Sequence, residues 1–432
     1  MDSKYLVSEP SPGFRVVCYE TERFKTGRLS VGFVLPLGEQ ASAYAVLPYL
    51  LSKTCAAYPT MVKLNQKLAD LYGALLTPSV SKFGENQVLR LSMTFLDNRF
   101  AFSKEDLLLE SAKLLCQVIF LPHLSASGCF LAEDVEREKR LMQERLEEEY
   151  NDKKAYALRR TEEIMCEDEA YAINPWGTPE GVAALTPETV TEAWKTMLFT
   201  ARIQLNIVGN GDQSKVVSAF QRAMSGVKRA ASLTPLRAGL QPEVEKEKHV
   251  TETQAVEQGK LVLGFRTGMK DTEKDFPAFA VMTDLLGGGP YSRLFRQVRE
   301  KESLCYYCSA RLYSRKGILA VQSGVETENA QKTEKAVLAQ LREMQEGGVT
   351  EEDLQNSKRS LLDRYHSVSD TPEEIEGWAH MQICDPRFKT AEEVADSLLS
   401  VTREDVLAAA RTVKLDTVFL LKEKEELPCC TK

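Results

Sequence analysis

The chain has 432 residues, of which 43% are hydrophobic and 27% are charged, and its formal net charge is −8. This length allows two domains with separate cores, and the negative charge argues against a nucleic-acid-binding protein, which normally carries a basic face. The sequence shows neither an apolar run near the roughly 20 residues of a membrane span nor the basic and apolar regions of a secretory signal, so we expect a cytoplasmic protein.

The predicted elements of the first half follow a definite order. A turn precedes an alternating strand, a helix, a long charged helix, a capped helix start and a closing strand, at residues 71–73, 88–95, 107–118, about 134 to 166, 185–188 and 203–209. The strand alternates apolar and polar side chains, which is typical of a sheet with one covered face. Thr186 has the features of a helix N-cap, with an acidic residue in the turn that follows.

The second half repeats this order. Its corresponding segments are residues 303–306, 318–325, 334–344, a charged helix that opens near residue 350, 401–404 and 415–421. Because the order recurs as a pattern, we infer a duplicated domain. The predicted fold class is α+β, with two homologous domains that each have a mainly antiparallel sheet covered on one face by helices. We place the domains at residues 1–226 and 254–432, joined by a charged, proline-containing linker at residues 227–253.

Ten cysteines are scattered without a disulfide-like framework, as expected for buried thiols in a reducing compartment. Two pairs stand out, namely Cys305-x-x-Cys308 and Cys429-Cys430. A lone C-x-x-C can be a redox pair or half of a metal site. The sequence has no second such pair and no histidine at ligand spacing, and the two tyrosines between the cysteines favour a strand. We therefore prefer a partly buried strand and keep the redox or metal role as the alternative.

A glycine-rich and cationic segment spans residues 285–306. Three consecutive glycines, at 287–289, permit close backbone approach or positive φ angles. A phosphate-binding loop is disfavoured, because the segment matches neither G-x-G-x-x-G nor G-x-x-x-x-G-K-[ST]. The arginines that follow the glycines are compatible with a solvated helix face.

The same segment resembles the second-domain signature of the pitrilysin/insulinase family of zinc peptidases, which includes the mitochondrial processing peptidase. The shared pattern is a glycine-containing helix end, S-R-L-F, R-E-K, a small-residue turn and a tyrosine. In that family an arginine and a tyrosine seven residues later grip the substrate peptide. Arg299 and Tyr306 have this spacing, so the resemblance implies that they bind substrate.

The implied roles fit the chemistry of the two side chains. A guanidinium can hold peptide carbonyls or a carboxylate, and a phenol can donate to a developing oxyanion. The alternative interpretations are a surface ion pair for Arg299 and a half-buried strand position for Tyr306.

The resemblance also locates a zinc site that this chain has lost. The family motif is H-x-x-E-H on a helix, with a second glutamate downstream as a further ligand. Residues 40–54 resemble the motif helix, but Tyr44, Leu47 and Pro48 stand where the family has His, Glu and His. The sequence contains only four histidines and no H-x-x-E-H. We therefore expect no metal ligands in this chain.

The downstream glutamate is also replaced. Residues 138–146 resemble the family's glutamate helix, and Arg145 aligns with the ligand, although another register keeps Glu144 in place. A cation at that position would repel zinc. The other carboxylates of this helix are best explained as a solvated face.

The resemblance covers residues 14–421. It implies that two chains share the peptidase site, one carrying the zinc and the other binding the substrate. We expect a non-catalytic subunit without a cofactor of its own, paired as a heterodimer with an H-x-x-E-H-bearing family member that carries the zinc. The substrate would be a peptide. The alternatives are a structural subunit and a stand-alone peptide-binding homodimer without peptidase activity. A serine-type triad is spatial, so the sequence alone leaves an independent hydrolase open.

Overall fold

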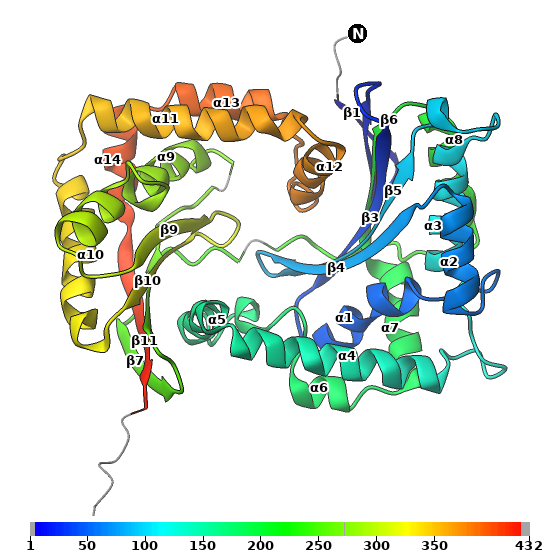
Figure 1. Ribbon diagram of the computed structural model, residues 1–432, viewed down its shortest axis with the longest axis horizontal. Helices are drawn as coiled ribbons and strands as arrows, with labels where there is room; N and C mark the ends of the chain where they lie inside the picture. Colours follow the sequence, from blue (N-terminus) through cyan, green and yellow to red (C-terminus); the bar gives the residue numbers. More distant parts are fainter. Residues whose placement is uncertain (1–4, 238, 272, 425–432) are drawn as a thin grey trace, which may run out of the picture. The chain divides into compact units, whose positions relative to one another are not determined.

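The computed structural model describes residues 5–237, 239–271 and 273–424. The chain forms two compact units, each with one β-sheet and packed helices, which confirms the predicted α+β class (Figure 1). We call them the six-stranded unit, residues 1–146, 173–237 and 367–390, and the five-stranded unit, residues 147–172, 238–366 and 391–432. Within the described residues, no helix combines the length and the apolar character that crossing a membrane requires.

The units exchange segments between the two halves of the sequence. Residues 147–172 come from the first half and belong to the five-stranded unit, whereas residues 367–390 come from the second half and belong to the six-stranded unit. The predicted domains at 1–226 and 254–432 were contiguous, so they did not anticipate this exchange. The described part of the predicted linker holds neither helix nor strand until an edge strand begins at Lys248.

The sheet of the six-stranded unit is mainly antiparallel. Its strands are β1 (Tyr5–Ser11), β2 (Phe14–Glu20), β3 (Thr26–Pro36), β4 (Leu75–Phe83), β5 (Asn86–Leu96) and β6 (Arg202–Gly209). They lie in the order β1-β2-β6-β3-β5-β4, with β2 and β6 parallel and the other neighbours antiparallel. The predicted strands at residues 88–95 and 203–209 are β5 and β6.

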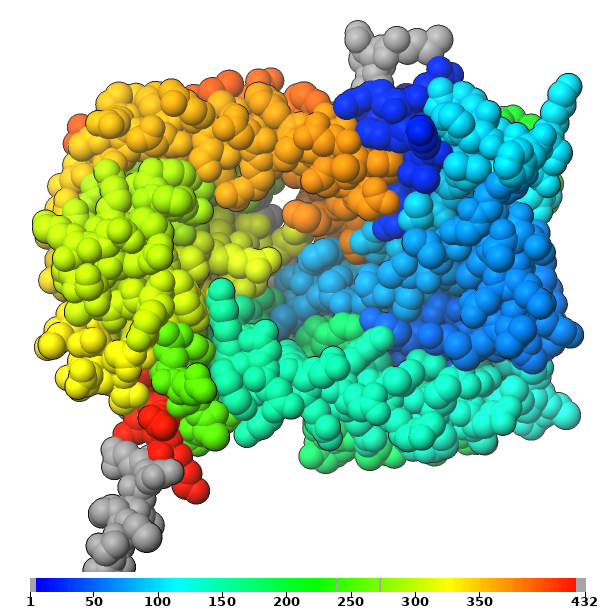
Figure 2. All heavy atoms as spheres, viewed as in Figure 1, coloured from blue at the N-terminus to red at the C-terminus, as the bar shows by residue number. Residues whose placement is uncertain are grey.

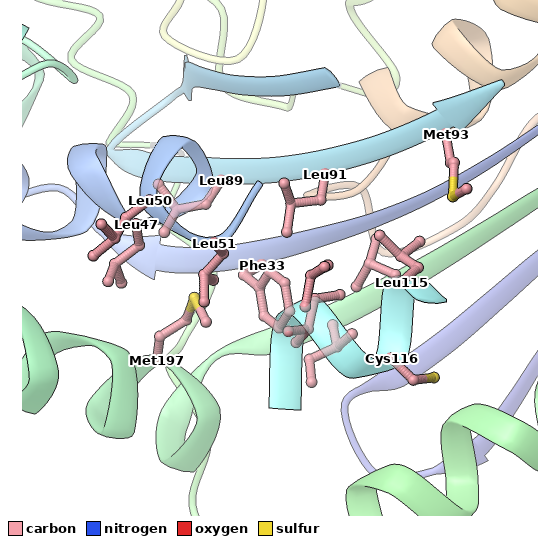
Figure 3. Packing of buried hydrophobic residues seen from close by; sticks show 14 of the residues in the cluster. Phe33, Leu47, Leu50, Leu51, Leu89, Leu91, Met93, Leu115, Cys116 and Met197 are labelled. Atoms are coloured by element: carbon pink, nitrogen blue, oxygen red, sulfur yellow. The ribbon is translucent and has the colours of Figure 1, made fainter. Parts of the chain in front are cut away.

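Helices cover one face of this sheet and enclose its core. They include α1 (Ala41–Leu51), α2 (Met61–Asp70), α3 (Leu107–Phe120), α4 (Ala132–Asn151), α6 (Pro179–Ala183), α7 (Pro187–Thr200) and α8 (Gln213–Ser225). Figure 3 shows side chains of α1 and α3, among them Leu47 and Leu115, packed against Phe33, Leu89 and Leu91 of the sheet. Thr186 caps α7 as predicted, in a reciprocal capping box with Thr189.

The other face of the same sheet is covered by α12 (Pro372–Met381), from the exchanged segment. Helix α12 packs on β3 and β6, and in Figure 2 its orange surface adjoins the blue surface of the N-terminal strands. A Cβ at Gly32 of β3 would lie only 2.4 Å from Ile383 Cδ1, so this glycine permits close packing. The prediction of one covered face was therefore incomplete.

A buried carboxylate fixes α12 to the sheet. Glu376 is fully buried, forms an ion pair with Arg90 of β5 and lies 3.7 Å from Arg28 of β3. Ser30 donates a further hydrogen bond to this carboxylate. A buried carboxylate is tolerated only when it is paired and hydrogen-bonded, so this network selects the position of α12.

The five-stranded unit has the same general plan. Its strands are β7 (Lys248–Gln254), β8 (Gly259–Arg266), β9 (Tyr307–Tyr313), β10 (Ile318–Val325) and β11 (Lys414–Glu423), in the order β7-β11-β8-β10-β9. Only the β7–β11 pair among these is parallel. The accompanying helices are α5 (Lys153–Met165), α9 (Phe276–Gly287), α10 (Ala330–Gln345), α11 (Glu351–His366), α13 (Ala391–Leu399) and α14 (Arg403–Thr412). Thr402, within the predicted cap segment 401–404, caps α14.

The prediction of one long charged helix over residues 134–166 is wrong in one respect. The segment forms two helices, α4 and α5, because Asp152 interrupts the helix and caps α5. Its side chain accepts hydrogen bonds from the backbone N–H groups of Lys154 and Ala155. Helix α5 then packs on β8 and β11.

A second buried network fixes the segment that carries α5. Arg266 of β8 is 3% exposed and donates to Glu169 at 2.6 Å and to Asp416 at 3.0 Å. The buried Lys316 lies 2.5 Å from the same glutamate. Burial by itself raises the pKa of Glu169, but the hydrogen bonds from Arg266 and Lys316 outweigh it and hold that pKa below its ordinary value.

We expect Glu376→Gln to destabilise the six-stranded unit by about 3 kcal/mol, because two partly buried arginines would lose their counter-charge. Urea unfolding followed by limited proteolysis of residues 367–390 measures this effect. Glu373→Gln is the matched control, since Glu373 lies on the same helix, is 52% exposed and sits 3.8 Å from Arg28. The control should cost at most about 1 kcal/mol. Equal effects of the two variants would contradict the role of the buried network.

Candidate functional site

The five-stranded unit contains an open cavity at the two residues predicted to bind substrate. Its volume is about 420 Å³. The lining residues come from the segment before β9 and from the turn after β10: Arg299, Glu300, Ser303, Leu304, Cys305, Tyr306, Glu326 and Asn329. The structure therefore brings Arg299 and Tyr306 together on one surface. Their role in substrate binding stays a prediction.

Arg299 belongs to a π-helix over Leu294–Lys301. Leu294 and Val298 are fully buried on one side of this helix, whereas the Arg299 side chain is 39% exposed. Its guanidinium lies 4.5 Å from the centre of the Phe295 ring and 3.7 Å from Glu300. The expected surface ion pair is thus present, but such pairs contribute about 0–1 kcal/mol. Arg299 can therefore exchange it for a ligand at little cost.

The backbone between Arg299 and Tyr306 is unusual. The Glu302 N–H donates to the Gln297 carbonyl at 2.9 Å, the wider spacing of a π-helix, and Ser303 has a positive φ of 53°. A positive φ is uncommon for a residue other than glycine. π-Helical turns and such backbone conformations are enriched at functional sites. This local geometry turns the chain so that Arg299 and Tyr306 face one cavity.

Tyr306 is held at both ends. Its backbone N–H donates to the Gly324 carbonyl at 2.9 Å, and its hydroxyl donates to Glu326, while the side chain remains 58% exposed. The hydrogen bond to Glu326 and the negative charge of this carboxylate raise the pKa of Tyr306. The phenol therefore keeps its proton at neutral pH. Tyr306 precedes β9 and is more exposed than the strand position that we considered as the alternative.

Sequence reasoning missed Glu326 and the place of Cys305 in the cavity. Glu326 directly follows β10, and the antiparallel register that pairs Gly324 with Tyr307 brings it to Tyr306. No spacing in the sequence carries that information. Packing explains the first glycine of the run: a Cβ at Gly287 would lie 2.5 Å from the backbone nitrogen of Ala310, so this glycine lets α9 approach β9.

The positions where the resemblance places the zinc motif lie in the six-stranded unit. Tyr44, Leu47 and Pro48 are buried residues of α1. Leu47, which the resemblance aligns with the family's glutamate, points into the hydrophobic core (Figure 3). None of these side chains has the imidazole or carboxylate that zinc binding requires. The residues present at this place do not fit a zinc ion.

Arg145 completes the replacement. Its guanidinium carbon lies 3.6 Å from the centre of the Tyr49 ring of α1 and 5.6 Å from that of Trp176. An arginine stacked on aromatic faces makes a cation–π interaction. The neighbouring Glu144 is exposed. A stacked cation thus stands where the resemblance expects a metal-binding carboxylate. Among the residues that the structure describes, no three or more His, Cys, Asp or Glu side chains gather so that they could hold a metal.

We expect Arg145→Ala to lower the free energy of unfolding of the six-stranded unit by about 1 kcal/mol, through loss of the stacking on Tyr49 and Trp176. Thermal and urea unfolding measure the change. Arg140→Ala is the matched control, because Arg140 is exposed on the same helix. If the control is equally destabilising, the stacked cluster contributes nothing specific.

Comparisons with known proteins agree with this geometry. Residues 184–361 match the family described as Peptidase M16 inactive domain. The probable inactive metalloprotease YmfF of Bacillus subtilis is 29% identical over 407 residues, which cover 94% of this chain and 95% of that protein. The subtilosin biosynthesis protein AlbE of Bacillus subtilis is 22% identical over 403 residues, covering 91% and 96%.

A solved structure extends the similarity to the whole fold. The crystal structure of a conserved protein from Enterococcus faecalis superposes with a TM-score of 0.89 at 26% identity, and it covers 98% of this chain and 99% of that one. These similarities agree with the absence of H-x-x-E-H from the sequence. The chain is therefore similar to inactive members of the M16 peptidase family.

Proposed function

We propose that this chain is the non-catalytic subunit of a heterodimeric zinc peptidase and supplies Arg299 and Tyr306 to a partner chain that carries the zinc. One observation supports this most directly. The two residues line a single open cavity with accessible side chains, whereas the positions of the zinc motif are a packed part of the core. We expect the complex in the cytoplasm, which fits the scattered cysteines of the sequence.

The chemistry of the cavity suits an extended peptide. Arg299 can donate to a peptide carbonyl or a carboxylate through its guanidinium. In the observed arrangement the Tyr306 hydroxyl donates a hydrogen bond to Glu326. Its oxygen can accept from a ligand in this state, and the hydroxyl can donate to a ligand once the bond to Glu326 is exchanged. The partner's zinc would supply an activated water, and this chain would contribute positioning of the substrate.

A second candidate is a stand-alone peptide-binding homodimer without peptidase activity. The relative AlbE favours it, because its name describes a protein of bacteriocin biosynthesis and no protease. The candidates differ in their partners. The heterodimer needs a chain with H-x-x-E-H, and the homodimer binds a peptide without zinc.

Purification of the tagged full-length chain from its native host, with mass spectrometry of bound proteins, distinguishes the two. A near-stoichiometric H-x-x-E-H chain supports the shared peptidase. Recovery of this chain alone overturns the heterodimer and favours the second candidate.

In the purified complex, we expect Arg299→Ala and Tyr306→Phe each to reduce kcat/KM by about 10- to 100-fold, because each removes a group that positions the peptide. The amount of partner recovered with the variant should not change. Peptidase assays and quantitative pull-down measure the two quantities.

Lys301→Ala is the control for charge on the same helix, because Lys301 is exposed and does not line the cavity. It should retain wild-type turnover. Unchanged turnover in both the Arg299 and the Tyr306 variant would overturn the proposed binding role.

We also expect the chain purified alone to contain far less than one zinc ion per molecule and to cleave no peptide. The reason is that the motif positions carry Tyr44, Leu47 and Pro48, and Arg145 places a cation beside them. Elemental analysis after dialysis against zinc measures the metal content, with an H-x-x-E-H family member as the positive control. Stoichiometric zinc in this chain would contradict the assignment.

A further inference from the structure

Two cysteines flank Tyr306 at the candidate site. Cys305 is half-buried and lines the cavity beside Arg299, and Cys308 is a buried residue of β9. Both are free thiols. The sequence favoured a partly buried strand for this C-x-x-C, but β9 begins only at Tyr307, so Cys305 lies in the turn before the strand.

The two thiols are in contact with each other. The Cys308 side chain hydrogen-bonds to Cys305, and the Ser323 hydroxyl donates to Cys308 Sγ at 3.1 Å. The chain bends at Tyr306, which allows side chains three residues apart to meet. In a straight strand they would point to opposite faces. The cysteines are thus a pair placed by the backbone rather than two isolated thiols.

The pair is chemically asymmetric. The hydrogen bond from Cys308 and the nearby Arg299 lower the pKa of Cys305 against the opposing effect of burial. The same hydrogen bond and burial raise the pKa of Cys308 well above its ordinary value. Because the thiolate is the nucleophile, the accessible Cys305 is suited to attack an oxidant. The buried Cys308 is suited to resolve the product.

We infer that Cys305 and Cys308 are a redox-active dithiol that low-molecular-weight disulfides oxidise to an intramolecular disulfide. First, the Cys305 thiolate attacks one sulfur of glutathione disulfide, which forms a mixed disulfide and releases one glutathione thiolate. Cys308 then attacks the Cys305 sulfur and its proton passes to the departing glutathione sulfur, which forms the internal disulfide and releases the second glutathione as a thiol. The two protein thiols lose two electrons, and glutathione disulfide gains them.

The disulfide would alter the cavity itself. Tyr306 lies between the two cysteines, so the bond would close a short loop around it, and it would remove the Cys305 thiol from beside Arg299. Resting on the proposed function, we expect oxidation to weaken peptide turnover in the complex. Disulfides in reducing compartments are usually transient or redox-sensing, which suits a reversible switch.

The test uses the full chain with Cys429→Ser and Cys430→Ser, since these two cysteines lie outside the described residues. The protein is incubated with glutathione disulfide, free thiols are alkylated, and peptides are mapped by mass spectrometry. We expect the peptide that contains both cysteines to carry no alkyl group and to weigh two hydrogens less than the unalkylated dithiol peptide. Treatment with dithiothreitol before alkylation should restore both alkyl groups. Cys129, which is half-buried, serves as an internal control. Its alkylation should be the same with and without glutathione disulfide.

Two single variants separate the roles of the cysteines. Cys308→Ser should accumulate a glutathione mixed disulfide on Cys305 severalfold above wild type, because the resolving thiol is gone. Cys305→Ser should leave Cys308 unmodified. Circular dichroism confirms that both variants fold. Persistence of both thiols in wild type, or no mixed disulfide in Cys308→Ser, would overturn the assignment.

The dithiol test requires only this chain, so it can fail or succeed independently of the heterodimer. In an active complex, oxidation should reduce peptide turnover severalfold, and the Cys305→Ser complex should be insensitive to glutathione disulfide. If the disulfide forms and turnover stays constant, the link between the dithiol and the peptide site is overturned.

Discussion

The fold depends on two buried ion networks, each of which fixes a segment that comes from the other half of the sequence. In the six-stranded unit, Glu376 of α12 is surrounded by Arg28 and Arg90 of the sheet. In the five-stranded unit, Glu169 after α5 receives Arg266 and Lys316. Unpaired buried charges are costly, so each network is stable only in the observed docking. Apolar packing by itself tolerates several positions of a helix.

These networks complete two sheets that would otherwise each have an open face. The residues of β3 alternate between a core with α1 and α3 and a second face beneath α12. Helix α5 covers β8 and β11 in the same way. A sheet that is packed on both faces holds its strands in fixed positions, and the candidate site lies beside two such strands. The β9–β10 hairpin holds Tyr306 at its backbone and its hydroxyl, so an exposed side chain has a defined position.

A packed structure occupies the positions where the resemblance expects the zinc motif. Leu47 belongs to the hydrophobic core, and Arg145 stacks on Tyr49. The stacking of Arg145 on Tyr49 and Trp176 is a cation–π interaction, which attracts the guanidinium to the ring faces. The buried side chains of Tyr44, Leu47 and Pro48 offer no imidazole or carboxylate to a zinc ion. In the other unit, Arg299 and Tyr306 line one open cavity.

The sequence alone determined the α+β class, the strands near 88–95 and 318–325, the Thr186 and Thr402 caps and the loss of H-x-x-E-H. These features are local, because periodicity, capping and motif chemistry act over a few neighbouring residues. The tertiary structure decided the exchange of α5 and α12, the partnership of Tyr306 with Glu326 and the contact between Cys305 and Cys308. Each joins residues through strand register, chain reversal or buried charge, which no local pattern encodes.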